Sequence, residues 1–504
     1  MAAIALGVLL GGCQSFFALN PSLDISQYAR TTWRVRDGFS LGNIFAMAQT
    51  PDGYLWFATE YGLVRFDGVR RVAWEPPSGQ HLPNKGAYSL LVTRDGILWI
   101  GTFSGLARWD GARLTRYPDL DGNFVTSMLE DRKGTVWAGL LGGRSDTSSG
   151  QLCAIRSAHA QCYSNEGAFG SFVWGLSEDS SGALWAGAES GLWRWEPGPP
   201  KRYPMPQMRI TDLTKGDNGR PLIAVSGAGL QQFAGEGVES YPLRDATDPK
   251  RVLRDHDVDS NKLLRDRDGG LWIGTVQHGL IHVHGGRADV FTKADGLSGD
   301  IVMSLCEDRE GNIWVATTGG IDRFRELPAT SISVKQGLSS DAVTAVVASS
   351  DGSIWVATYG GLTRLKDGKT TIFRKGSGLP ADFVQSLFQD DREQTWATFA
   401  GQGLGYLKDD RFVAVVGVPS TEVYSITGDN AGNVWLSGNR GLSHLRDGHL
   451  VEHFPWSVLG RHQQAKVIVF DRERGGLGFH SGTMVVSSIS RMVKFARPIL
   501  PLTG

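Results

Sequence analysis

The chain has 504 residues, of which 66 are glycine, 16 are tryptophan and 41% are hydrophobic. This composition is typical of many short strands joined by tight turns, and it disfavours a fold of long helices. Lysine and arginine total 51 and aspartate and glutamate total 52, so no net charge attracts the chain to nucleic acid or to an anionic membrane. The expected fold class is all-β.

The first 19 residues, MAAIALGVLLGGCQSFFAL, are mostly apolar and carry no charge. Such a segment predicts an export signal over residues 1–19, either a signal peptide or a lipoprotein leader. Leu10-Gly11-Gly12-Cys13 resembles a bacterial lipobox, which would place a lipid on Cys13, although the basic start of a signal peptide is missing. The predicted location is the periplasm, or the membrane with the chain facing the periplasm.

From about residue 31 a single unit recurs, in which an apolar stretch, an Asp-containing turn and Gly precede Trp, a small residue and Gly-Leu. Two copies read PDGYLWFATEYGLVRFDG from Pro51 and SDGSIWVATYGGLTRLKDG from Ser350. The repeated tryptophans are Trp56, Trp99, Trp137, Trp185, Trp272, Trp314, Trp355, Trp396 and Trp435, and Leu222 takes the position in a degenerate copy. Their spacing of about 40 residues matches one four-stranded propeller blade.

The repeat therefore predicts a β-propeller of four-stranded blades, with about eleven repeats. The tryptophans are expected to pack between adjacent blades and to take no part in ligand binding. The turn aspartates are expected to shape hairpins, because Asp can bond to the backbone ahead of it and Gly accepts a positive φ. These aspartates include Asp52, Asp95, Asp131, Asp179, Asp308 and Asp351.

Propellers have four to eight blades, so the repeats predict two rings. We expect a seven-bladed propeller at residues 20–329, a partial second propeller of four blades at 330–477, and an atypical tail at 478–504. TTWRVRDG from Thr31 resembles the last strand of a blade and is expected to pair with the seventh unit, around Trp314. The second ring would keep an unpaired edge that is prone to aggregation. Gly478 stands where Trp is expected, which suggests a truncation or frameshift near residue 477.

The recurring pattern D-x-x-G-x-I/L-W-I/V-A/G-T-x-x-G-L resembles the two-component regulator propeller repeat over about residues 31 to 478. This resemblance implies a periplasmic sensor region of a histidine kinase, with a kinase module or a homodimer partner. No phosphoacceptor helix and no ATP-binding glycine loop is recognisable in the sequence, so we expect this chain, as it stands, not to be an enzyme. A single copy of the pattern also resembles the Asp box of sialidase-like propellers.

Cysteine and histidine provide few candidates for chemistry. Cys153 and Cys162 flank IRSAHAQ in a predicted hairpin and form either a disulfide or two reduced thiols on neighbouring strands. His282 and His284 would share one strand face with His278 nearby, but no carboxylate at ligand spacing accompanies them. They are interpreted as solvated strand residues that align with Arg108 and Asp110 of another unit. No metal, cofactor or catalytic residue is predicted.

A ligand is expected on the face that carries the loops between second and third strands and between blades, near the central channel. Residues 140–170 are an insertion in the third unit, which either adds a recognition loop or is simply tolerated. The candidate contacts are Glu60, Tyr61, Phe103, Ser104, Glu189, Gln277, His278 and Tyr359. This mixed aromatic and polar set suits a carbohydrate or a small polar molecule, although it also fits unselected surface loops.

Three functions stay open on the sequence alone. The first is a ligand-sensing propeller of a two-component sensor, which binds a small molecule or glycan without chemistry of its own. The second is a stand-alone binding or scaffolding lipoprotein, and the third is a carbohydrate-active propeller enzyme. None of the three requires a nucleic-acid partner.

Overall fold

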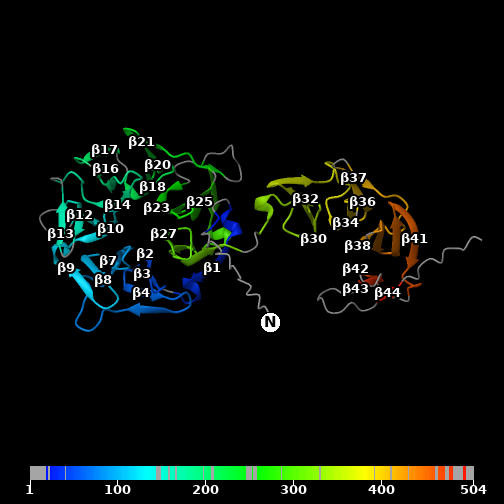
Figure 1. Cartoon of the computed structure of the whole chain (residues 1–504), viewed down its shortest axis with the longest axis horizontal. Helices are drawn as coiled ribbons and strands as arrows, with labels where there is room; N and C mark the ends of the chain where they lie inside the picture. The colour runs from blue at the N-terminus through cyan, green and yellow to red at the C-terminus, as the bar shows by residue number, and fades with distance from the viewer. Residues whose placement is uncertain are drawn as a thin grey trace, which may run out of the picture. The chain divides into compact units, whose positions relative to one another are not determined.

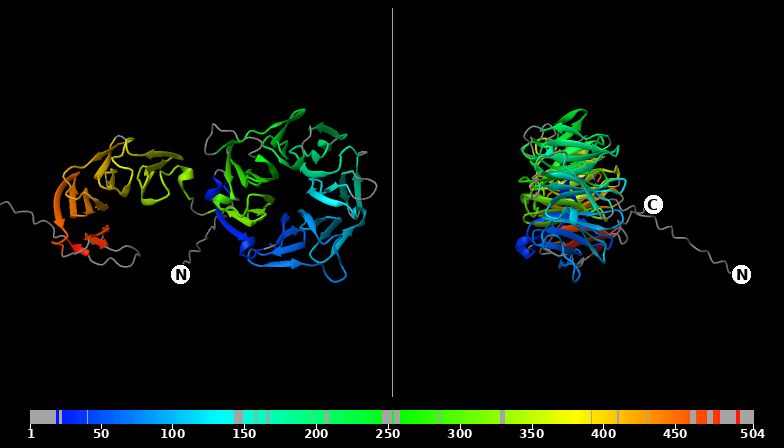
Figure 2. Two further views of the ribbon diagram at one scale, coloured as in Figure 1. Left: turned by 180° about the vertical axis from the view of Figure 1, so that it is seen from behind. Right: turned by 90° about the vertical axis from the view of Figure 1, so that its left-hand side faces the viewer.

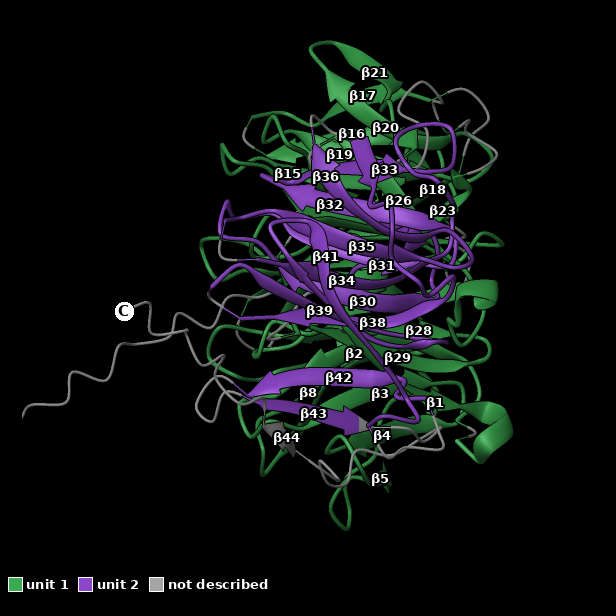
Figure 3. Ribbon diagram, turned by 90° about the vertical axis from the view of Figure 1, so that its right-hand side faces the viewer, with its two compact units in different colours: residues 1–331 green, residues 332–504 purple. Residues whose placement is uncertain are grey.

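The structure is a computed structural model that divides the chain into two compact units, Met1–Ser331 and Ile332–Gly504 (Figure 3). The described residues are 19–20, 23–39, 41–142, 149–156, 159–164, 167–196, 198–205, 209–245, 253, 258–284, 286–327, 331–390, 392–408, 411–429, 431–459, 464–471, 476–480 and 492–494. Cys13 and nearly all of the predicted leader lie outside these residues, as does most of the predicted tail.

The described residues of the first unit form seven sheets, each built around four antiparallel strands. The first three blades are β2 (Ile44–Gln49), β3 (Leu55–Thr59), β4 (Gly62–Phe66) and β5 (Arg71–Trp74); β6 (Ala87–Val92), β7 (Leu98–Thr102), β8 (Gly105–Trp109) and β9 (Leu114–Tyr117); and β10 (Phe124–Glu130), β11 (Val136–Leu141), β12 (Gln151–Arg156) and β13 (His159–Tyr163). The next two are β14 (Val173–Glu178), β15 (Leu184–Ala188), β16 (Gly191–Glu196) and β17 (Lys201–Pro204); and β18 (Ile210–Lys215), β19 (Pro221–Val225), β20 (Gly229–Ala234) and β21 (Gly237–Ser240).

The sixth blade is β23 (Ser260–Arg265), β24 (Leu271–Thr275), β25 (Leu280–His284) and β26 (Arg287–Phe291), with β22 (Arg244–Asp245) added in parallel to β26. The seventh is β27 (Val302–Glu307), β28 (Ile313–Thr317) and β29 (Gly320–Arg325), completed by β1 (Ala29–Arg34). The described helical segments are short 3-10 turns: η1 (Ile25–Gln27), η2 (Val35–Asp37), η3 (Pro118–Leu120), η6 (Lys293–Asp295) and η7 (Val334–Gln336).

The first unit closes on itself (Figure 2). Strand β1 runs antiparallel to β29 with Thr31 opposite Arg323, which is the pairing expected for the segment that begins at Thr31. The first strand of each blade contacts that of the next, and β2 contacts both β6 and β27. The seven blades therefore form a complete ring in which a strand from the start of the chain finishes the last blade, and no blade edge is left open at the seam.

The second unit is an open arc (Figure 1). Its blades are β30 (Val343–Ala348), β31 (Ile354–Thr358), β32 (Gly361–Lys366) and β33 (Lys369–Phe373); β34 (Val384–Gln389), β35 (Thr395–Phe399), β36 (Gly403–Lys408) and β37 (Arg411–Ala414); β38 (Val423–Gly428), β39 (Asn433–Gly438), β40 (Gly441–Arg446) and β41 (His449–Pro455); and β42 (Val467–Asp471), β43 (Gly476–His480) and β44 (Met492–Lys494). Strand β30 contacts β34, β34 contacts β38, and β38 contacts β42. The fold is thus one seven-bladed propeller followed by a partial second ring.

The repeated tryptophans lie on the second strand of their blades and are buried, each no more than 6% exposed. Each packs against the next blade: Trp56 lies in one cluster with Leu98 and Ile100 of the second blade. Trp314 of the seventh blade lies in one cluster with Ile44 and Phe57 of the first, so the same contact closes the ring. Burying one large aromatic ring at each boundary makes these contacts the main apolar link between blades.

The turn aspartates occupy two positions that the sequence interpretation merged into one. Asp131 and Asp308, six residues before their tryptophans, accept the indole N–H of Trp137 at 2.9 Å and of Trp314 at 2.7 Å. Asp52, four residues before Trp56, instead accepts the Thr50 hydroxyl at 2.5 Å. Asp179 belongs to the first group, and Asp95 and Asp351 belong to the second. The first position satisfies a buried donor on the packing residue as well as shaping the hairpin.

A second contact recurs on the third strand, opposite several of the tryptophans. Arg65, Arg323 and Arg364 place their guanidinium groups 5.2–5.4 Å from the ring centroids of the facing tryptophans. Other blades use a ring at this position, so Tyr406 lies 5.3 Å from Trp396. On these blades the third-strand residue covers one face of the buried indole ring with a flat group.

The corner loops between blades are held by their own aspartates. Asp300 accepts the backbone N–H of Lys293 at 2.7 Å, and Asp382 accepts that of Lys375 at 2.7 Å. Gly296, at φ +114°, ends the turn in a left-handed conformation that favours glycine. These hydrogen bonds hold the conformation of the loops, and the loops lie on the face on which a ligand was expected.

Candidate functional site

Two of the predicted ligand contacts have backbone partners in their own blades. Glu60 accepts the N–H of Asn43 at 3.3 Å, and Glu189 accepts the N–H of Ser171 at 2.6 Å. Each carboxylate thus ties a turn between second and third strands to the loop that enters the same blade. Both side chains contribute to the shape of this face.

The other predicted contacts are spread over the molecule. Tyr61 is 68% exposed and lines an open cleft together with Trp74 and Lys85. Gln277 and His278 are exposed on the sixth blade. These residues therefore do not meet one another in one site.

Ser104 and Tyr359 are likewise separate from them. The Ser104 N–H donates to the Thr102 hydroxyl at 3.2 Å, and its carbonyl accepts the N–H of Gly122. Tyr359 belongs to the second unit, where its ring stacks on Phe383 at 4.3 Å between centroids. Of the eight candidates, Phe103 is the one that leads to a cluster.

Phe103 joins a group of half-buried aromatic rings, which we call the channel cluster and which consists of Phe45, Tyr88, Phe103, Phe124, Phe172 and Trp174. Phe103 lies 5.0 Å from Phe124 and 5.8 Å from Phe45, centroid to centroid. Because Phe103 sits in the turn between β7 and β8, the cluster lies at the face on which a ligand was expected.

The cluster brings together side chains from four neighbouring blades. Tyr88 of the second blade and Trp174 of the fourth lie 5.8 Å apart, although the third blade stands between their blades in the ring. Phe124 of that third blade completes the set, 4.7 Å from Tyr88 and 6.1 Å from Trp174. Side chains of the second and fourth blades can meet in this way only on the side of the central channel.

β-bulges place three of these rings there. The pairing of first and second strands shifts at Phe45, Tyr88 and Trp174, so each has no partner residue opposite it. A bulge leaves the extra residue out of the ladder and re-aims its side chain. These strand positions were not among the predicted contacts, because strand register cannot be read from an isolated sequence.

The same bulge position is polar on other blades. The Thr126 hydroxyl lies within hydrogen-bond distance of the carbonyls of Gly139 and Val173, and Asn261 donates to the carbonyl of Val302 at 2.9 Å. These side chains tie neighbouring blades together across the inner strands. The bulge residue is thus aromatic on the first, second and fourth blades and polar on the third and sixth.

Arg209, just before β18, lies against two rings of the cluster. Its guanidinium carbon lies 4.9 Å from the Trp174 centroid and 5.3 Å from that of Phe172, and its side chain is exposed. The Trp174 Nε1 atom is buried and has no hydrogen-bond partner. The site thus offers ring faces, one indole donor and one guanidinium group.

The interpretation of His282 as a solvated residue is wrong. Its side chain is fully buried and stacks on Trp272 at 4.2 Å between centroids, in the position that Arg65 takes in the first blade. Burial lowers the pKa of His282 to about 3, with the neighbouring His284 as a smaller cause, so the ring is neutral at neutral pH. His284 Nε2 lies 3.2 Å from an Asp24 oxygen.

Neither a metal centre nor a membrane helix is present in the described part of the chain. No group of three or more His, Cys, Asp or Glu side chains is placed there to hold a metal ion. None of the helices among the described residues has the length and apolar character needed to cross a bilayer.

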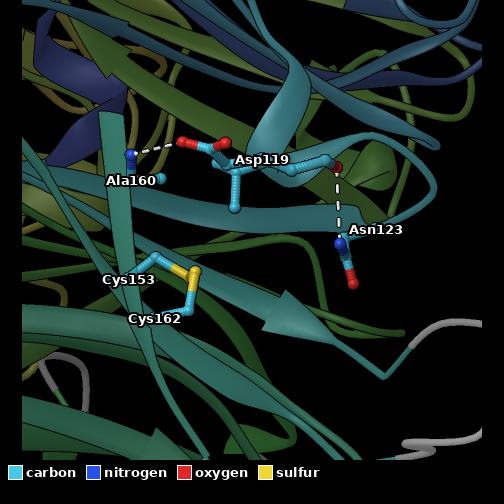
Figure 4. Close-up of a disulfide and its surroundings, with 6 residues drawn as sticks. Asp119, Asn123, Cys153, Ala160 and Cys162 are labelled. Carbon is cyan, nitrogen blue, oxygen red and sulfur yellow. Dashed lines mark hydrogen bonds between the residues drawn. A yellow bond between two sulfur atoms is a disulfide. The ribbon is translucent and has the colours of Figure 1, made fainter. Parts of the chain in front are cut away.

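The interpretation of residues 140–170 as an insertion is also wrong for much of that segment. Residues 151–156 and 159–163 are the regular third and fourth strands of the third blade, β12 and β13. Cys153 and Cys162 face each other in this pair and form a disulfide, next to the Ala160 N–H that donates to Asp119 at 3.1 Å (Figure 4). The segment therefore completes a blade.

The family comparison matches the chain to the two component regulator propeller model. The matched segments are residues 38–61, 81–104, 119–142, 296–319 and 337–360. Four lie in the first unit and one in the second. No curated protein matches the chain in sequence.

Solved structures share the fold. The extracellular domain of a protein described as a hybrid two component system, BT3049 of B. thetaiotaomicron, is 20% identical with a TM-score of 0.62, and the match covers 90% of this chain and 65% of that one. The chain thus spans slightly less than two thirds of that structure.

Two further structures match with lower scores. The extracellular domain of BT4673 from the same organism, described as a one component system, is 17% identical with a TM-score of 0.48, and the match covers 90% of this chain and 64% of that one. Virginiamycin B lyase of Staphylococcus aureus is 15% identical with a TM-score of 0.46, over 60% of this chain and 100% of the lyase. The match of the two component regulator propeller model at five repeat positions confirms the resemblance found in the sequence.

Proposed function

We propose that this chain is the ligand-recognising, extracytoplasmic propeller region of a two-component sensor and has no chemistry of its own. The observation that carries the proposal is the match of five repeats to the two component regulator propeller model. The shared fold with an extracellular domain described as part of a hybrid two component system is consistent with it. In this proposal residues 1–19 direct export, and a histidine kinase module is the signalling partner.

The first ring provides the recognition surface in this proposal. A closed ring holds its face rigidly, and loops and strand ends on a rigid scaffold are where binding residues usually lie. The channel cluster adds half-buried rings with few polar groups, which is the common composition of small-molecule sites. A ligand bound there would contact several blades at once.

A thermal-shift screen of the purified full-length chain tests this function. The panel contains soluble sugars, amino acids and organic acids, each at millimolar concentration. A ligand that binds only the folded state stabilises it, by about 2.7 kcal/mol at 100 times its Kd, so at least one compound should raise the Tm.

Chromatography of each hit after incubation with the protein completes the test. We expect every hit to be recovered unchanged. A panel without any hit would contradict the sensor proposal, and a hit that is converted to product would show that the chain is an enzyme.

A further inference from the structure

We infer that the channel cluster binds a flat aromatic ring that carries a carboxylate, that is, an aryl carboxylate. This inference rests on the proposed sensing function and names the chemical class of its ligand. It differs from the carbohydrate or small polar ligand that the turn residues alone suggested.

The ring part of the ligand follows from the composition of the cluster. Its six rings are half-buried, so each keeps some surface open to solvent. Tyr88 stands edge-on to Phe124, with an interplanar angle of 90°, and tilts by 38° toward Trp174. Edge-on and offset pairs are the favoured contacts between aromatic rings. A flat ligand ring can make the same kinds of contact with the cluster that its own rings make with one another.

The carboxylate part follows from Arg209. The guanidinium group lies over the ring faces of Phe172 and Trp174, and none of its N–H groups donates to another described residue, so they can pair with an anion. Within the described residues, no carboxylate lies at ion-pair distance from Arg209.

Trp174 provides a second, independent observation. Its Nε1 is a buried donor without a partner, and an unpaired buried donor is unfavourable by about 1–3 kcal/mol. The other tryptophan donors of the first ring show what is usual, because the indole N–H of Trp137 and of Trp185 both reach an aspartate. In the inferred complex the ligand carboxylate pairs with Arg209, and a small rotation of the Trp174 ring exposes the indole N–H so that the same carboxylate accepts it.

The polar groups also argue against a sugar. Sugar hydroxyls must be matched by several side-chain donors and acceptors, since each unmatched polar group lowers affinity. The cluster offers the Tyr88 hydroxyl, the Trp174 indole and the Arg209 guanidinium group. This set suits one anionic group on an otherwise apolar ligand.

Calorimetric titration of the full-length chain with benzoate, 2-naphthoate and indole-3-acetate tests the inference. Neutral 2-naphthamide isolates the contribution of the charge, and galacturonate isolates that of the aromatic ring. We expect at least one aryl carboxylate to bind, with 2-naphthamide and galacturonate at least ten-fold weaker, because a hydrogen bond to a charged group contributes about 1.5–3 kcal/mol.

Two substitutions connect binding to the cluster. Arg209→Gln should weaken the aryl carboxylate by about ten-fold or more, and Trp174→Phe, which keeps a ring but removes the indole N–H, by several-fold. Arg202→Gln, an exposed arginine on β17 of the fourth blade, is the matched control and should leave binding unchanged. An unchanged Tm without ligand confirms that each variant folds.

The outcomes separate this inference from the proposed function. It is overturned if no aryl carboxylate binds, or if binding is the same in Arg209→Gln and in the wild type. If another compound from the thermal-shift panel binds equally well to both variants, the sensing function stands and the channel cluster is not its site. If nothing in either panel binds, the sensing function fails as well.

Discussion

The closed first ring and the open second arc expose the same repeat positions to very different extents. Val343, Val346 and Ile354 of the first blade in the arc are 46%, 58% and 40% exposed. Their counterparts in the first blade of the ring, Ile44, Met47 and Leu55, are 3%, 6% and 3% exposed. Within the ring, Trp314 of the seventh blade covers that face, whereas within the described part of the arc no blade packs on it.

The hairpins themselves are the same in both units. Val346 lies opposite Val356 and Met47 lies opposite Phe57, and the bulge that follows the first strand residue is present in both blades. Blade formation therefore depends on local sequence, while burial of the blade face depends on the neighbouring blade. The comparison predicts that contacts across blade boundaries carry more stability in the ring than at the open end of the arc.

The largest effect is expected at the seam of the ring. Trp314→Ala removes the indole that joins the seventh blade to the first, and the Asp308 carboxylate loses its buried donor. Truncating a buried tryptophan in this way destabilises by about 3–5 kcal/mol. Scanning calorimetry should show the unfolding transition of the first unit at a lower temperature than in the wild type.

Trp435→Ala is the matched substitution in the arc. Trp435 contacts the blade of β42 and β43, which has no further described blade beyond it. We expect hydrogen exchange to accelerate in that terminal blade and to stay unchanged in the first ring. Equal acceleration throughout the first unit in this variant would show that the two units do not unfold independently.

A second pair of substitutions compares one position in both settings. Met47→Ala creates a cavity beside Trp314 and should lower the unfolding free energy of the ring by about 2–5 kcal/mol. Val346→Ala, at the equivalent exposed position, should change stability by no more than about 0.5 kcal/mol. Urea unfolding measures both.

Val346→Lys extends this test to self-association. An exposed apolar face on an open edge favours contact between molecules, and a charge there opposes it. Sedimentation velocity should show less association in the variant than in the wild type. If Val346→Ala instead lowers the unfolding free energy by several kcal/mol in the urea experiment, this face is covered in solution.

The repeat made the fold predictable from sequence. Trp, Gly and Asp recur at fixed offsets, so the blade, its strands and the seven-plus-four division follow from comparing copies of the unit. The pairing of the segment from Thr31 could also be predicted, because that segment resembles a final strand without the strands before it. Such features depend on local pattern, which the sequence displays directly.

The candidate site could not be predicted in the same way. Phe45, Tyr88 and Trp174 follow apolar residues of the first strands and look like ordinary strand residues until the bulge is known. His282 looked solvated because its counterpart in another unit is Arg108, yet a neutral imidazole can be buried where a guanidinium group must reach water. Both features depend on register and burial, which arise only when the blades pack.

An effect of pH is expected at the position where His282 stacks on Trp272. The folded-state pKa of His282 is lowered by burial to about 3, from an ordinary value near 6.5, so only the unfolded chain binds this proton between those values. Stability is therefore complete above pH 6.5 and falls by about 1.4 kcal/mol per pH unit below it. Between pH 7 and pH 5 the first unit should lose about 2 kcal/mol through this histidine.

His444 sharpens the comparison, because it stacks in the same way on Trp435 of the arc, at 4.1 Å between centroids. Its pKa is also lowered by burial, but the nearby Glu452 and Asp429 oppose this lowering.

His282→Phe keeps a ring on Trp272 and removes the titrating group, so this variant should lose less stability than the wild type between pH 7 and pH 5. His444→Phe should change the pH dependence less, because the carboxylates beside His444 stabilise its charged form. The two variants could instead reduce the pH dependence of stability equally. That result would mean that stacking on the repeated tryptophan, and not burial in the closed ring, sets the pKa of both histidines.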